Sequence, residues 1–186
     1  MNKVSQIVLG SLLTFASLVV PVPEAQANTH EEHVELWNTL QEVGITTLIN
    51  HPSVCKDDDD SDGVYFYLDS TLIVCQDNAH SFGSKEVGWT PNDYDTLRHE
   101  AHHVIQDCLV GGLADGESGL LFDDSDELKE FVFDALTERQ VNNIIEGYRE
   151  MGADDDVILR ELEAFAVAAS VDADSISDAL RDICRV

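Results

Sequence analysis

The chain has 186 residues, with 37 acidic residues against 10 lysines and arginines, which gives a formal net charge of −27 at pH 7. A surface of this sign repels nucleic acids and anionic membranes, so we exclude both as partners. We interpret the acidity first as a solvated coat suited to salty surroundings, and only second as an attraction for cationic substrates over acidic ones. The length suits one domain with a hydrophobic core rather than two.

Residues 1–27 have the layout of an export signal. A positive start precedes an apolar run from Ile7 to Val20, and Ala25-Gln26-Ala27 is an A-x-A cleavage site. An uncleaved anchor is the alternative, but the apolar run is short for a membrane span and Pro21 follows it. We therefore expect a secreted or periplasmic protein whose mature chain, residues 28–186, forms a single domain.

The mature chain is predicted to open with a helix. Thr29 and Glu32 have the spacing of a capping box, and apolar residues at helical intervals follow them. Gly44 either ends this helix or is tolerated within a helix that continues to about Asn50. The apolar stripe consists of Val34, Trp37 and Leu40.

An acidic loop comes next, and its residues Asp58 to Gly63 fit the pattern D-x-D-x-D-G of a calcium-binding loop. Asp69 takes the twelfth position, where such loops have a bidentate Glu, and the residues after the pattern favour a strand instead of a helix. We therefore prefer a charged turn. Ca²⁺ held by Asp58, Asp60 and Asp62 is kept as a second cofactor hypothesis.

Two runs rich in aromatic and β-branched residues, Val64–Leu68 and Thr71–Cys75, follow this loop. Such runs are typical of strands, and the two residues between them, Asp69 and Ser70, favour a hairpin. We predict a small antiparallel sheet at this point.

A helix is predicted from Thr90-Pro91 to Gly111-Gly112, because Thr is a favoured N-cap, Pro suits the first helical position and Gly ends helices. Asp93 and Asp95 place negative charge near the N-terminus of this helix, where the helix dipole favours it. The apolar stripe consists of Tyr94, Leu97, Ala101, Val104 and Cys108.

The segment His99-Glu100-Ala101-His102-His103 lies within this helix and matches the motif H-E-x-x-H. Residues four apart share a helix face, so His99 and His103 can bind one Zn²⁺ while Glu100 faces a metal-bound water. His102 projects from a different side of the helix. We expect His102 to flank the site rather than to bind the same ion.

Three further helices are predicted: from Asp124 to near Gly152, from about Asp156 to Ala169, and from Ile176 to Ile183. The glycine-containing stretch 113–126 is predicted to be a mobile loop near the site. The predicted fold class is therefore α+β, mainly helical, with a small antiparallel hairpin or sheet before the motif helix.

The four cysteines favour two disulfides, because an even number in an exported chain points to an oxidising compartment. Three pairings are possible. We prefer Cys55 with Cys75, across a local loop and hairpin, and Cys108 with Cys184, which ties the last helix to the motif helix. No C-x-x-C spacing is present, so a cysteine-rich zinc site is disfavoured.

On its H-E-x-x-H motif, the helix around it and the hairpin before it, the chain resembles the zincin metallopeptidases. The metzincin subtype is excluded, because Gln106 and Leu109 stand where that subtype has Gly and its third His. In gluzincins the third ligand is a Glu on a later helix, followed by small residues, and Glu163-Ala164-Phe165-Ala166 resembles that pattern. Glu161 is the near alternative, turned by about half a helical turn.

The resemblance implies zinc held by His99, His103 and Glu163, with Glu100 as the catalytic general base. It also implies that the sheet binds an extended peptide along an edge strand, which we assign to Thr71–Cys75. The pattern departs from the family in one place: Val167 stands where thermolysin-like enzymes have an Asp that orients a zinc histidine. Another group would have to orient the imidazoles.

The predicted function is a secreted zinc metallopeptidase, with a peptide or protein as its substrate, that hydrolyses peptide bonds by metal-activated water. Glu100 would take the proton of the water and pass it to the leaving amine. Tyr148, Tyr94 and His80 are the candidates for stabilising the oxyanion. The alternative function is an exported, non-catalytic metal-binding or protein-interaction domain.

Overall fold

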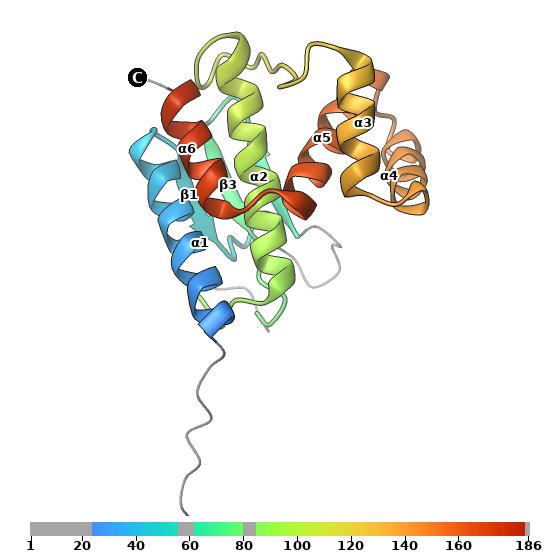
Figure 1. Ribbon diagram of the computed structural model, residues 1–186. Coiled ribbons are helices and arrows are strands. Elements are labelled where there is room, and N and C mark those ends of the chain that lie inside the picture. The colour runs from blue at the N-terminus through green and yellow to red at the C-terminus, as the bar shows by residue number, and fades with distance from the viewer. Residues whose placement is uncertain (1–23, 56–61, 80–84, 185–186) are drawn as a thin grey trace, which may run out of the picture.

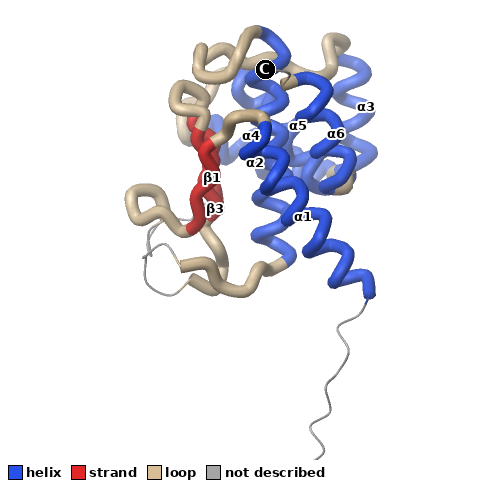
Figure 2. Tube along the Cα trace, turned by 90° about the vertical axis from the view of Figure 1, so that its left-hand side faces the viewer, coloured by secondary structure: helices blue, strands red, loops and turns tan. Residues whose placement is uncertain are grey.

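The computed structural model describes residues 24–55, 62–79 and 85–184. Within these ranges the chain is mixed α+β and mainly helical, which confirms the predicted fold class. Figure 2 shows the sheet at one side of the molecule, with helices packed against it. Residues 1–23 of the predicted signal, Asp58 and Asp60 of the calcium hypothesis, and His80 lie outside the described residues.

The elements follow the chain in the order α1, three strands, and α2 to α6 (Figure 1). Their bounds are α1 Glu24–Glu42, β1 Thr46–Ile49, β2 Gly63–Phe66, β3 Thr71–Val74, α2 Pro91–Val110, α3 Ser125–Ala135, α4 Glu138–Glu150, α5 Asp155–Ser170 and α6 Ala173–Ile183.

The first helix begins before its predicted start at Thr29 and ends just before Gly44, at the shorter of the two predicted ends. Helix α1 starts at Glu24, before the expected cap at Thr29. Gly44 adopts a positive φ of 99°, a conformation that favours glycine and that terminates helices, so the helix does not continue to Asn50. The chain then enters β1, which pairs parallel to β3.

The hairpin is confirmed, but its second strand is not an edge. β2 and β3 pair antiparallel, and the strand order is β1-β3-β2. The assignment of Thr71–Cys75 as a substrate-binding edge strand is therefore wrong, because β1 occupies the second side of β3. Of the three strands, β1 and β2 form the edges of this sheet.

Strand β2 lies directly against the motif helix α2. A Cβ atom on Gly63 would come within 2.6 Å of Cγ2 of Thr96 and 3.2 Å of Cγ of Glu100, so only glycine allows this approach. The hydroxyl of Tyr65 donates a 2.6 Å hydrogen bond to the buried Asp107. The edge of the sheet is thereby held beside Glu100.

Helix α2 begins as predicted, with a capping box between Thr90 and Asp93 and with Pro91 in the first turn. Its apolar face enters the main core, but the opposite side is buried as well. Six polar residues are enclosed there: His99, Glu100, His102, His103, Gln106 and Asp107. Burying polar side chains costs free energy unless they are paired, so this side of the helix marks a specialised site.

The single helix predicted from Asp124 to Gly152 is wrong, because two helices occupy this stretch. Helix α3 ends at Ala135, and Thr137 caps α4 through a capping box with Gln140. The sequence Thr137-Glu138-Arg139-Gln140 carries this T-x-x-Q signal, which the apolar periodicity concealed. Helices α5 and α6 lie close to their predicted ranges.

Two hydrophobic clusters meet at α5. One cluster contains buried residues of α1, the sheet, α2 and α6, and the other lies between α3, α4 and α5. Val167 of α5 belongs to the first cluster, whereas Ile158, Leu162 and Ala166 belong to the second. The carboxylates that α5 carries between these positions therefore face α2 at the boundary of the two clusters.

Both disulfides have the preferred pairing, Cys55–Cys75 and Cys108–Cys184, with Cα atoms 5.4 and 5.2 Å apart. The second disulfide joins the end of α2 to the end of α6. Two disulfides suggest an extracellular or otherwise oxidising compartment. Among the residues that the structure describes, no helix combines the length and apolar character needed to cross a membrane.

Candidate metal centre

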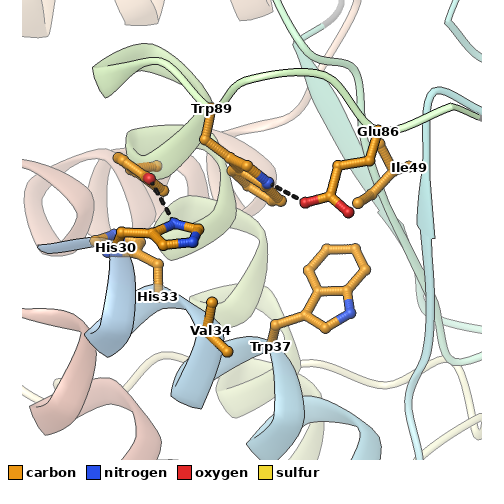
Figure 3. A pocket seen from close by; sticks show the side chains of 8 residues that line it. His30, His33, Val34, Trp37, Ile49, Glu86 and Trp89 are labelled. Carbon is orange, nitrogen blue, oxygen red and sulfur yellow. Dashed lines mark hydrogen bonds between the residues drawn. The ribbon is translucent and has the colours of Figure 1, made fainter. Parts of the chain in front are cut away.

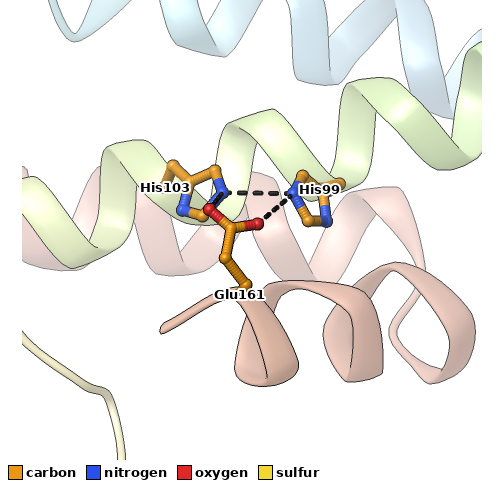
Figure 4. A group of neighbouring side chains, drawn as sticks. All are labelled: His99, His103 and Glu161. Atoms are coloured by element: carbon orange, nitrogen blue, oxygen red, sulfur yellow. Dashed lines mark hydrogen bonds and ion pairs between the residues drawn. The ribbon is translucent and has the colours of Figure 1, made fainter. Parts of the chain in front are cut away.

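His99 and His103 lie one turn apart on α2 and point toward one another (Figure 4). Their side chains are largely enclosed, since only 9% and 5% of their surfaces are exposed. The two Nε2 atoms are 3.1 Å apart. The i, i+4 spacing thus brings the two imidazole nitrogens together, as the motif predicts.

Glu161 reaches this pair from α5 (Figure 4). Its Oε2 lies 3.3 Å from Nε2 of His99, and its Oε1 lies 3.5 Å from Nε2 of His103. Ligands of a tetrahedral Zn²⁺ with bonds of about 2.0–2.1 Å lie about 3.3 Å from one another. Two imidazoles and one carboxylate at these separations form a group that could hold a metal ion.

Glu163, the preferred third ligand, does not join this group. Its Oε2 accepts hydrogen bonds from Nε2 of His102 at 3.0 Å and from the side-chain amide of Gln106 at 2.7 Å. In the structure it is Glu161, the near alternative, and not Glu163 that lies with the two histidines. Two residues along a helix turn a side chain by about 200°, so the two carboxylates face different neighbours.

The other oxygen of Glu163 holds the loop that was expected to be mobile. Its Oε1 accepts hydrogen bonds from the backbone N–H groups of Leu121 and Phe122, at 2.8 and 3.2 Å. The side chain is fully buried, and the donors around it lower the pKa of Glu163 although burial acts to raise it. Glu163 is thus an ionised anchor that joins α2, α5 and the loop.

Gln106 supplies an orienting contact for His103; the residue four positions after Glu161 is Phe165, whose side chain has no acceptor. Its amide nitrogen donates to the carbonyl of Arg160 at 3.0 Å and to Glu163, so the amide oxygen must face His103. That oxygen accepts from Nδ1 of His103 at 2.7 Å. The proton on Nδ1 leaves Nε2 as the atom that can bind a metal. This role of Gln106 was not predicted from the sequence, although its i+3 spacing from His103 could have indicated it.

Replacing Gln106 by Leu is expected to lower zinc affinity about 10- to 100-fold, because the imidazole of His103 loses the acceptor that sets its tautomer. The measurement is a competition titration against a chromophoric zinc chelator. Circular dichroism of the metal-free variant checks that the fold persists. A folded variant with unchanged zinc affinity would show that Gln106 does not orient the ligand.

The charges of the group are strongly coupled. Burial alone lowers the pKa of His103, but the neighbouring Glu161 carboxylate outweighs it and raises that pKa to about 9. The same contacts hold the pKa of Glu161 well below its usual range, against the effect of burial. Without a metal, His103 is therefore protonated at neutral pH. A metal must displace this proton, so apparent affinity rises with pH up to about 9.

Apart from the contacts of its Nε2 with His103 and Glu161, His99 is positioned by packing. Its ring contacts Phe165 of α5, with 4.4 Å between the ring centroids. Nδ1 of His99 is buried without a hydrogen-bond partner among the described residues. The two imidazoles of the group are thus held differently, one by an amide oxygen and one by an aromatic ring.

Glu100 lies beside the group and is 7% exposed. Burial raises its pKa, while the nearby His99 and His103 and a hydrogen bond from the backbone N–H of Tyr65 lower it by a smaller amount. A carboxyl group with a raised pKa is suited to accept a proton and return it near neutral pH. The contact with Tyr65 places this carboxyl group next to the edge strand β2.

Two tyrosines flank the group, of which only one was anticipated. The hydroxyl of Tyr148 donates a 2.6 Å hydrogen bond to Oε2 of Glu161, and the hydroxyl oxygen of Tyr67 lies 3.2 Å from Nδ1 of His103. Burial and the charge of Glu161 raise the pKa of both phenols, so both stay protonated. Tyr94 lies elsewhere, stacked on Trp89.

The sequence matches no protein-family model and no curated protein, and the fold matches no solved structure.

Proposed function

We propose that the protein is a zinc-dependent hydrolase of peptide bonds. The observation that carries this proposal is the convergence of His99, His103 and Glu161, with the buried carboxyl group of Glu100 beside them. Two neutral nitrogens and one carboxylate are a common ligand set of catalytic zinc, which keeps a further coordination position for water. Export of the chain after cleavage of residues 1–27 is part of the same proposal.

Each residue of the group has a role in such a reaction. Zinc bound by the two histidines and Glu161 would acidify water and polarise the scissile carbonyl. Glu100 accepts the proton of the attacking water and delivers it to the leaving amine. The hydroxyl of Tyr148 donates its one proton to Oε2 of Glu161, so it would stabilise the oxyanion by turning from that carboxylate toward the substrate.

The substrate is expected to lie along β2 rather than β3. β2 is an edge strand, and its residue Gly63 lies against the side chain of Glu100, so the edge adjoins the proposed base. An extended peptide pairs with a sheet edge through backbone hydrogen bonds, which select side chains only loosely. This placement is consistent with an enzyme that cleaves within peptides.

The test is metal removal and restoration. The purified protein is expected to carry about one zinc ion per chain and to cleave members of a diverse peptide library. Treatment with a chelator should abolish cleavage, and one equivalent of Zn²⁺ should restore it. His103→Ala is expected to remove both zinc and cleavage, whereas the matched control His51→Ala, whose imidazole contacts Ser53 away from the group, should retain both.

Two outcomes would overturn the proposal in different ways. Stoichiometric zinc without cleavage of any library member would favour the alternative, a non-catalytic metal-binding or interaction domain. Cleavage that resists the chelator and persists in His103→Ala would show that the hydrolytic site lies elsewhere.

A further inference from the structure

A second candidate site lies apart from the metal group, between α1, the segment before α2 and the first turn of α2 (Figure 3). It is a pocket of about 200 Å³ that shares no residue with the metal group. Its lining is mainly aromatic and aliphatic, with one carboxylate: His30, His33, Val34, Trp37, Ile49, Glu86, Trp89 and Tyr94.

Three aromatic rings form connected walls of this pocket. The rings of Trp37 and Trp89 are almost perpendicular, at 79°, with centroids 5.9 Å apart. Trp89 in turn stacks on Tyr94 at 5.6 Å, with only 8° between the ring planes. The faces of such rings carry negative electrostatic potential, so aromatic walls of this kind attract cations.

The carboxylate of Glu86 adds a full negative charge to the same walls. The indole nitrogen of Trp89 donates a 2.7 Å hydrogen bond to Oε1 of Glu86. Figure 3 shows this carboxylate next to that nitrogen and on the same side of the pocket as the indole of Trp37. No other described residue hydrogen-bonds the carboxylate, so its charge is not neutralised within the described structure.

His33, one of the lining residues, does not oppose this charge. Nδ1 of His33 donates to the carbonyl of Thr29 at 2.6 Å, while its Nε2 accepts from Arg98 at 2.8 Å. Both ring nitrogens are thus occupied as in the neutral imidazole, and burial lowers the pKa of His33. Arg98 itself forms an ion pair with Asp95.

We propose that this pocket binds a quaternary ammonium group, carried either by a small molecule such as choline or by a trimethylated lysine side chain. Such a group has no N–H to satisfy, so aromatic faces and the aliphatic side chains of Val34 and Ile49 suit its methyl groups. Glu86 provides the counter-charge, and the net charge of −27 raises the local concentration of cations.

The chain contains two tryptophans, and both line the pocket, so intrinsic tryptophan fluorescence reports on it directly. Titration with choline at constant ionic strength is expected to give a saturable change. Its neutral isostere 3,3-dimethylbutan-1-ol should bind at least about five-fold more weakly, because it lacks the cation–π attraction. Peptides with trimethyllysine or unmodified lysine distinguish a side-chain ligand from a small-molecule ligand.

Glu86→Gln is expected to weaken choline binding at least about three-fold and to leave binding of the neutral isostere unchanged. The control Glu146→Gln makes the same charge change at an exposed site on α4 and should leave choline binding unchanged. Absence of saturable binding by choline and by the trimethyllysine peptide, equal binding of choline and its isostere, or equal effects of the two variants would each overturn the proposal. None of these readouts depends on zinc or on peptide cleavage, so this site is tested separately from the proposed enzyme activity.

Discussion

Replacement of Glu100 by Gln is expected to lower the rate of peptide hydrolysis by about 10²- to 10⁴-fold while the protein keeps its zinc. Glutamine has nearly the same shape, and its amide oxygen can still accept the hydrogen bond from the backbone of Tyr65. It cannot accept a proton from water. Because Glu100 is not one of the three converging ligands, the affinity for zinc should stay close to that of the wild type.

The measurement combines kcat for a cleaved peptide with elemental analysis of the same sample. Glu146→Gln serves again as the matched control, and its kcat should equal that of the wild type. Unchanged hydrolysis in Glu100→Gln would refute the role of Glu100 as the base. Loss of zinc together with activity would instead place Glu100 among the metal ligands.

The same variant has an independent readout in the metal-free protein. Burial raises the pKa of Glu100 in the folded state, so the folded state binds more protons than the unfolded state as this group titrates. The free energy of unfolding therefore falls as pH rises from the unfolded pKa through the folded one. Glutamine does not titrate, so Glu100→Gln lacks this decrease in the free energy of unfolding. The difference in the free energy of unfolding between the variant and the wild type should therefore shift in favour of the variant as pH rises.

Replacement of Glu161 by Gln is expected to weaken zinc binding by more than about 100-fold, which exceeds the effect of losing a group that only orients a ligand. The variant loses the carboxylate that lies 3.3 and 3.5 Å from the two histidine nitrogens. The measurement is a chelator competition titration, with the hydrolysis rate at saturating Zn²⁺ as a second observable.

Glu163→Gln is the matched comparison, because it makes the same chemical change two residues away on α5. Its main expected effect is on stability. Both oxygens of Glu163 accept hydrogen bonds, and in the variant an amide NH₂ group replaces one of them and faces a donor instead of accepting from it. We expect the free energy of unfolding to fall by about 1–3 kcal/mol, with a smaller loss of zinc affinity than in Glu161→Gln. The reverse ranking of zinc affinities would restore Glu163 as the third ligand.

Features that depend on neighbouring residues along the chain were predicted well. The cap at Thr90 and Pro91, the hairpin and the pairing of the two histidines all arise from interactions within a few residues. The Cys108–Cys184 pairing was also anticipated, because the two cysteines were predicted at the ends of helices. Local hydrogen-bond geometry and helical spacing are sufficient for the cap, the hairpin and the histidine pair, whereas the disulfide joins residues 76 apart and was a preference among three pairings.

The errors involve competition between local signals or contacts between distant segments. Gly44 could end a helix or lie within one, and the strand that follows it forms only because β3 offers a parallel partner. The break before Thr137 was hidden because apolar residues of α3 and α4 continue one helical pattern into the same hydrophobic cluster. The edge strand was misassigned because β1, which pairs with the other side of β3, had not been recognised in the sequence.

The sequence by itself determined half of the candidate site: a helix holds His99 and His103 at one spacing whatever surrounds it, with Glu100 next to them. It did not determine which carboxylate lies beside the two histidines, because Glu161 and Glu163 differ only in which side of α5 they occupy. The rotation of α5 against α2 decides between them, and that rotation is set by the packing of Val167 into one cluster and of Leu162 and Ala166 into the other. The orienting role of Gln106 likewise exists only once α5 brings Arg160 and Glu163 to it.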